Sequence, residues 1–225
     1  MTILLSLLLV LSSPSVTAEP FFCDRGGSVL KYERRYVGTG EIEWRHTMKI
    51  VSVSGSSGTR RAMFTSEFRK DNGSVMYGGP VSLEADLEND GDVRMNVSGS
   101  YKSVVANIFH RDDIKAVDSY SVLPSDMSAG ESLPDASSVL TAGALKYSVN
   151  ITARRVLRTE RITTPAGTFD CVVVSEHKEE RGPGRNRTTT SLTWLSRGVG
   201  IVRHDTYDKN MKIETSEVLV SMSRP

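Results

Sequence analysis

The sequence has 225 residues, with 28 lysines and arginines, 27 aspartates and glutamates, and 38% hydrophobic residues. The formal net charge of +1 argues against a nucleic-acid-binding protein, whose basic surface would show in these totals. The hydrophobic content argues against a disordered chain. A chain of this length buries about 70% of its unfolded surface, so it needs no metal ion or disulfide to fold.

The first 18 residues have the pattern of a secretory signal peptide. The apolar run at residues 3–11 is followed by small residues that end in Val16, Thr17 and Ala18, which fits cleavage after Ala18. The run is shorter than the ~20 residues that span a bilayer, and no later segment has the length and apolar character of a membrane helix. We therefore expect a periplasmic or secreted protein in which residues 19–225 form a single β-rich domain.

The two cysteines of the chain raise the questions of lipid attachment and of a disulfide. Cys23 lies close to the signal, but Pro20, Phe21 and Phe22 precede it, and bulky residues there oppose lipid attachment. We therefore do not expect a lipoprotein. Two cysteines in an exported chain predict a disulfide between Cys23 and Cys171, with two buried thiols as the alternative.

Alternation of apolar and polar residues dominates the chain after the signal. Within residues 41–50, Trp44, His46 and Met48 lie on one face of a predicted strand, and their neighbours on the other face are polar or charged. Further strands are predicted at residues 28–36, 61–69, 81–87, 93–97, 145–154, 156–163, 169–177, 188–195, 200–207 and 212–222. Short turns rich in Gly, Pro, Asn and Asp join them, which favours antiparallel pairing.

Helical spacing occurs in one segment. Tyr101, Val104, Val105 and Ile108 form an apolar stripe that predicts a helix at residues 101–111, with Ser100 as its N-cap. We expect this stripe to pack against the apolar faces of the strands. Residues 123–136 are predicted to be irregular. The sequence thus predicts a mostly β protein with one short helix.

No sequence motif assigns a chemistry. The G-x-S-x-G, H-E-x-x-H and C-x-x-C motifs, the phosphate-binding loop and the dinucleotide fingerprint are absent, so we predict no enzyme, no cofactor and no metal site. His46 is the polar member of an apolar strand face, for which a hydrogen-bonded core histidine is favoured over a catalytic or ligand-binding role. Sequence alone does not place distant Ser, His and Asp residues together, so such a cluster in a cleft would revive the alternative of an unrecognised hydrolase.

Four short motifs carry a resemblance to a known family. They are G-S-V-L-K-Y at residues 27–32, G-E-S-L-P at 130–134, T-P-A-G-T-F at 164–169, and G-V-G-I-V at 198–202 after Trp194. The chain resembles a family of exported Gram-negative bacterial proteins with a domain of unknown function, some of them labelled TapB-like. That family is similar to the lipoprotein-localisation (LolA/LolB-like) fold. The resemblance implies a strongly curved antiparallel sheet that forms an unclosed barrel, with the helix covering its concave face, and it implies no activity and no functional residues.

Two functional hypotheses follow from such an architecture. An unclosed barrel leaves space on its concave side, so the leading hypothesis is a binding module for an apolar or amphipathic ligand such as a lipid or an acyl chain. The residues expected to line this space are Tyr32, Tyr36, Trp44, Met48, Tyr147 and Trp194. A dry core formed by the same residues is the alternative. The second hypothesis is an envelope interaction or assembly module whose sheet edges accept a partner strand.

Overall fold

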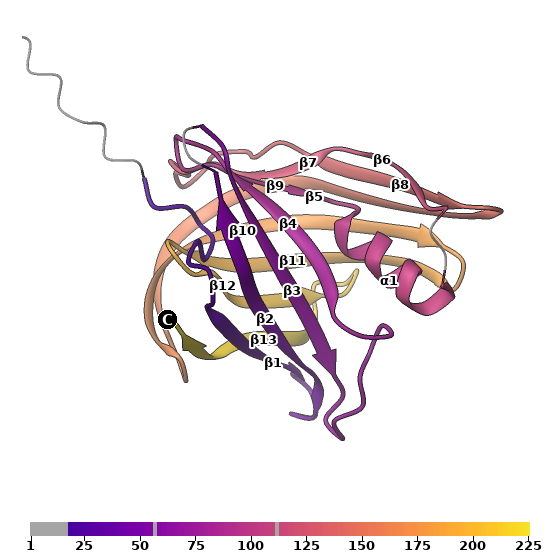
Figure 1. Ribbon diagram of the computed structural model, residues 1–225. Coiled ribbons are helices and arrows are strands. Elements are labelled where there is room, and N and C mark those ends of the chain that lie inside the picture. The colour runs from indigo at the N-terminus through magenta and orange to yellow at the C-terminus, as the bar shows by residue number, and fades with distance from the viewer. Residues whose placement is uncertain (1–17, 56–57, 111–112) are drawn as a thin grey trace, which may run out of the picture.

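The computed structural model describes residues 18–55, 58–110 and 113–225, so the predicted signal peptide, apart from Ala18, lies outside the described residues. The described chain forms thirteen strands and one helix (Figure 1). The strands are β1 (Val29–Tyr36), β2 (Ile42–Ser54), β3 (Arg60–Arg69), β4 (Val81–Leu87), β5 (Val93–Asn96), β6 (Lys115–Asp118), β7 (Tyr120–Leu123), β8 (Ala136–Ala142), β9 (Leu145–Thr164), β10 (Gly167–Gly182), β11 (Arg185–Ser196), β12 (Gly200–Tyr207) and β13 (Ile213–Ser223). The helix is α1 (Gly99–Phe109).

All thirteen strands belong to one antiparallel sheet, in the order β6-β8-β9-β10-β11-β12-β13-β1-β2-β3-β4-β5-β7. The two ends of this order are neighbours in the chain, because Ser119 alone separates β6 from β7. The backbone N–H of Ser119 donates to the carbonyl of Ser137 at 2.8 Å. The sheet therefore curls until its edges approach, but it is not closed into a barrel (Figure 1). The predicted mostly β fold with a curved, unclosed antiparallel sheet is confirmed.

The helix α1 begins two residues earlier than predicted. Asn96 Oδ1 accepts hydrogen bonds from the backbone N–H and the hydroxyl of Ser98, at 2.8 and 2.7 Å, and this turn sets the start of the helix. His110 ends the helix in the left-handed conformation, with φ of 49°. Ser103 and Asn107 hydrogen-bond backbone carbonyls of the β4 region, so α1 lies along β4 and covers part of the concave side (Figure 1). No helix of the described residues has the length and apolar character required to cross a membrane.

Two differences from the predicted strands have physical causes. β9 continues through residues 145–164, where two strands were expected, because a bulge at Ala153 (φ 51°) bends the strand without ending it. β8 lies partly in a stretch expected to be irregular. Its inward-facing residues include Ala136, Ser138 and Ala142, whose small side chains carry little of the hydrophobic signal on which the prediction depends.

The concave side divides into a dry half and a polar half along the length of the strands. In β10, Val172 and Val174 are followed on the same face by Glu176, Lys178 and Glu180. The inward-facing residues of β1 and β12 also change from apolar to polar along the strand. The apolar ends meet in one core whose larger members include Phe21, Phe22, Leu30, Tyr32, Met48, Ile50, Phe64, Leu87, Val174, Val202 and Leu219. The polar ends border a hollow.

The predicted disulfide is not formed. Cys23 and Cys171 are both buried and both free, as in the alternative of two buried thiols. Cys23 lies in the segment that precedes β1, whereas the Cys171 thiol, on β10, is 3.8 Å from the carbonyl oxygen of Phe169. The two sulfurs thus have different surroundings. Burial, followed by the charges of Asp170 and Glu160, raises the pKa of Cys171 to about 12.

Candidate functional site

The polar half of the concave side contains a cavity of about 700 Å³. One wall is apolar and is built by α1, β3 and β4, with Phe68, Val81, Leu83, Val104 and Val105 facing the space. This wall uses the helical stripe that the sequence predicted. A cavity of this size falls in the range of ligand-binding sites, ~300–1,000 Å³.

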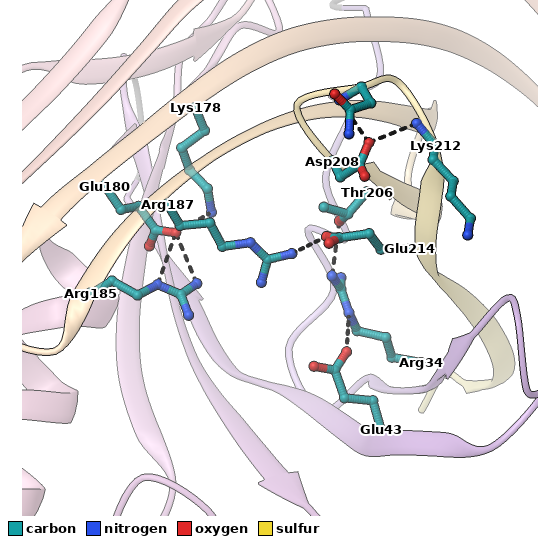
Figure 2. A network of polar contacts seen from close by, with 11 residues as sticks. Arg34, Glu43, Lys178, Glu180, Arg185, Arg187, Thr206, Asp208, Lys212 and Glu214 are labelled. Atoms are coloured by element: carbon teal, nitrogen blue, oxygen red, sulfur yellow. Dashed lines mark hydrogen bonds and ion pairs between the residues drawn. The ribbon is translucent and has the colours of Figure 1, made fainter.

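The opposite wall is charged, and Glu180 is its centre (Figure 2). The Glu180 side chain is 4% exposed. Its carboxylate accepts hydrogen bonds from Arg185 at 2.9 Å, from the Tyr147 hydroxyl at 2.8 Å and from the Tyr101 hydroxyl at 3.1 Å, and the Lys178 ammonium lies 3.9 Å away. Burial acts to raise the pKa of Glu180, but Lys178, Tyr147 and Arg185 outweigh it, so the pKa is lowered. Glu180 therefore stays ionised and ties α1 to β9 and β11.

A second charged group, Arg34, enters the cavity from β1. Its Nε lies 2.8 Å from Glu43 Oε2, and its Nη2 donates to the Thr206 hydroxyl at 2.9 Å (Figure 2). The guanidinium also lies over the ring of Trp44, 4.7 Å from the ring centroid. Nearby, Arg187 forms an ion pair with Glu214. These contacts hold the cations of the wall in fixed positions.

On the same concave face, the His46 ring lies within hydrogen-bond distance of both Ser66 and Glu217. Its Nδ1 lies 3.2 Å from Glu217 Oε1 and its Nε2 lies 3.0 Å from the Ser66 hydroxyl. The imidazole stacks on Phe68 at 4.3 Å and on Tyr32 at 5.0 Å between ring centroids. These two rings sit directly opposite His46 on β3 and β1. His46 is a hydrogen-bonded interior histidine, and Ser66 lies at the cavity surface.

The structure brings two of the six predicted site residues to the cavity. Trp44 and Tyr147 line it, from β2 and β9. Tyr36 follows Arg34 on the same face of β1 but lies at the strand end, where it is 43% exposed and outside the lining.

The other three predicted site residues do not line the cavity. Tyr32 and Met48 point to the concave side, as alternation requires, but they lie in its dry half and are buried in the core. Trp194 pairs with Val173, which alternates with the inward-facing Val172 and Val174, so its indole belongs to the convex face. There Arg203 and Glu160 cover it. Alternation assigns a face to a residue, but it does not give the position along the strand where packing ends.

The sequence pattern did not predict the charged wall. Arg34, Glu176, Lys178 and Glu180 occupy inward positions of their strands, where a soluble β protein normally places apolar residues. One signal could have found this wall. In several strands, the alternate positions that hold apolar residues at one end hold charged or polar residues at the other. In the described part of the chain, no three His, Cys, Asp or Glu side chains are grouped to hold a metal ion.

Comparison with known proteins places the chain in a family and a fold. A family model described as DUF3108-like matches residues 27–219. The crystal structure of a candidate lipoprotein from Parabacteroides distasonis has a TM-score of 0.74 and 22% identity, and the match covers 92% of this chain and 99% of that chain. A candidate exported protein with a YmcC-like fold from Bacteroides fragilis has a TM-score of 0.73 and 16% identity, with 92% and 100% covered. No curated protein matches the sequence.

These likenesses define what is shared. At such identities the two crystal structures share the fold with this chain, and the family is one of unknown function. One of the neighbours is itself described as a lipoprotein, so the expectation that this chain carries no lipid gains no support from the comparison. The family match spans nearly all of the described residues and agrees with the resemblance found in the sequence motifs. The chain belongs to the DUF3108-like family.

Proposed function

We propose that the protein is an exported, periplasmic module that binds an amphipathic ligand, such as a lipid or an acyl chain, in the cavity of its curved sheet. The observation that carries the proposal is a cavity of about 700 Å³ with one apolar wall and one charged wall. A molecule with an apolar and a polar part matches both walls at once.

The apolar wall supplies the affinity in this proposal. Burial of each methylene group against Val104, Val105 and Leu83 contributes about 0.8 kcal/mol. The charged wall orients the ligand. The cavity lining contains five lysines and arginines and two glutamates, and Glu43 and Glu214 outside the lining pair with Arg34 and Arg187, so the wall offers groups of both charges to the polar part of the ligand.

The test is direct binding of a fluorescent fatty acid, with native mass spectrometry of the purified protein. The variant Val105→Asp places a charge on the apolar wall, so we expect its affinity to fall at least tenfold, which corresponds to about 1.4 kcal/mol. Ile108 lies on the same helix but is 46% exposed and outside the lining, so Ile108→Asp is the matched control and should bind like the unmodified protein. Equal affinities for both variants, or no binding by the unmodified protein, would contradict the proposal.

A further inference from the structure

Ser66, His46 and Glu217 form a hydrogen-bonded row across the concave face. The row runs from the Ser66 hydroxyl to His46 Nε2 (3.0 Å) and from His46 Nδ1 to Glu217 Oε1 (3.2 Å). The three residues come from β3, β2 and β13, and β1 lies between the last two strands. Ser66 lines the cavity, and the other two residues lie outside the lining. The row therefore ends on the cavity with a hydroxyl group.

The charges around the row indicate which of its atoms donate hydrogen bonds and which accept them. Burial acts to raise the pKa of Glu217, but the hydrogen bond from His46, the attraction to protonated His46 and the charge of Arg34 outweigh it and lower that pKa to about 2. Glu217 is thus a carboxylate at neutral pH and accepts a hydrogen bond from His46 Nδ1. When His46 is neutral, its single N–H lies on Nδ1 toward Glu217, so Nε2 accepts the hydrogen bond from the Ser66 hydroxyl.

The row is also held rigidly. The His46 ring is stacked between Tyr32 and Phe68, at interplanar angles of 18° and 13°, so rotation away from Ser66 would require both neighbours to move. A second buried serine of the cavity, Ser191, offers a contrast. Its hydroxyl donates to the Glu176 carboxylate at 3.5 Å. Ser191 therefore shares the cavity with Ser66 and differs from it in the partner that would take its proton.

We propose that this cavity is a site of acyl transfer, in which Ser66 is the nucleophile toward an ester of a long-chain carboxylic acid, His46 is the base and Glu217 is a positioning residue. The arrangement is that of an activated serine, which is defined by geometry and roles and not by the order of the residues in the chain. The inference rests on the proposed function, because the acyl group is taken to occupy the apolar wall.

The reaction balances with water as the co-reactant. Ser66 Oγ bonds to the acyl carbon while its proton passes to His46 Nε2, the ester C–O bond breaks, and the leaving alcohol takes the proton from His46. Water then loses a proton to His46 and its oxygen bonds to the acyl carbon. The bond between Ser66 Oγ and the acyl carbon breaks, the acid leaves, and Oγ regains the proton. Arg34 lines the same cavity and lies 4.0 Å from Glu217, so it places a positive charge beside the row as the carbonyl oxygen becomes negative.

The test combines covalent labelling with hydrolysis by the full-length mature protein. A fluorophosphonate probe should form one adduct, which peptide mapping places on Ser66. Hydrolysis of p-nitrophenyl esters should increase from the butyrate to the octanoate ester. Ser66→Ala should remove the adduct and lower hydrolysis at least 100-fold, whereas the control Ser82→Ala, at an exposed serine of β4 outside the cavity lining, should keep both. Glu217→Gln should lower hydrolysis at least tenfold and move the pH at which activity rises, a shift that a loss of packing would not produce.

A fatty-acid binding measurement on the same samples separates the two proposals. Binding without an adduct and without hydrolysis would overturn the inference and leave the proposed binding function standing. An adduct on another residue would also overturn it. The absence of both binding and labelling would contradict the proposed function as well. Because peptide mapping locates the adduct on the unmodified protein, the result does not depend on the folding of any variant.

Discussion

Several inward-facing strand positions of this protein carry buried charged side chains. Burying a charge is costly unless it is paired and hydrogen-bonded. Glu180 meets that condition through Arg185 and two tyrosine hydroxyls, and Glu217 meets it through His46 and Arg34. These groups are satisfied as networks, so removal of one member takes a hydrogen bond or an ion pair from each of its neighbours. Their titration should therefore affect stability.

The charge of Glu217 should make stability depend on pH. Its pKa is lowered from 4.5 to about 2, so the folded state holds the carboxylate more strongly than the unfolded state does. The resulting stabilisation, roughly 3 kcal/mol, is complete above pH 4.5 and is lost as the pH falls toward 2. Urea unfolding of the unmodified protein and of Glu217→Gln should therefore give free energies whose difference is large at pH 6 and falls by more than half by pH 2.5.

Glu84→Gln is the control for the pH dependence expected from Glu217. Glu84 is a half-exposed glutamate of β4, and Glu84→Gln should follow the unmodified protein at every pH. A difference between the unmodified protein and Glu217→Gln that stays constant from pH 6 to pH 2.5 would show that Glu217 contributes through packing and not through its charge.

At the scale of the element, α1 is held in place by its tyrosine. Tyr101 donates its hydroxyl proton to Glu180 of β10 and packs its ring on Tyr147 of β9, at 5.2 Å between centroids. Serine and asparagine side chains attach the same helix to β4. The helix thus connects the two sides of the curved sheet and forms part of the apolar wall of the cavity.

Removal of the Tyr101 hydroxyl should loosen the helix selectively. Tyr101→Phe keeps the ring but loses a hydrogen bond to a buried carboxylate, which contributes about 1.5–3 kcal/mol. We expect the amides of α1 to exchange with deuterium about tenfold faster or more, while those of β1 and β2 stay unchanged. Tyr120 of β7 is 41% exposed and its ring faces Arg94, so Tyr120→Phe is the control and should leave α1 unaffected. Equal exchange in both variants would show that β4 alone holds the helix.

Individual strands show which parts of the fold could be predicted from the sequence. β4 and β12 begin and end where alternation predicted, at residues 81–87 and 200–207. β8 was missed because alanine and serine line its inner face. The hydrogen-bonded row could not be predicted, because Ser66, His46 and Glu217 meet only when β13 and β2 pair on either side of β1 and β3 pairs with β2. Local periodicity contains no information about that pairing.

One end of the curled sheet is filled by the apolar core, and the other end encloses the cavity. The N-terminal segment contributes to the filled end. Phe21 and Phe22 are buried, and Phe22 packs edge-on against Phe64 of β3, at 5.3 Å between ring centroids. The carbonyl of Pro20 accepts a hydrogen bond from Gly198 at 2.8 Å. The segment directly after the predicted cleavage site is thus part of the core.

The hypothesis of an envelope interaction module stays a prediction. The edge strand β6 carries Val117, which is 79% exposed and could contact a partner strand.

This packing predicts the form of the mature protein. Lipid attachment at Cys23 would make that residue the first of the chain and would remove Phe21 and Phe22 from the core, at a cost of about 1.5–3 kcal/mol each. The thiol that would carry the lipid is also fully buried. We therefore expect the exported chain to begin at Glu19 without acyl groups, as measured by intact mass and N-terminal sequencing after periplasmic extraction. Cys23→Ser should leave that mature N-terminus unchanged. A chain that begins at Cys23 with an added acyl mass, and a Cys23→Ser variant that stays unprocessed, would show instead that the protein is a lipoprotein whose N-terminal segment leaves the core.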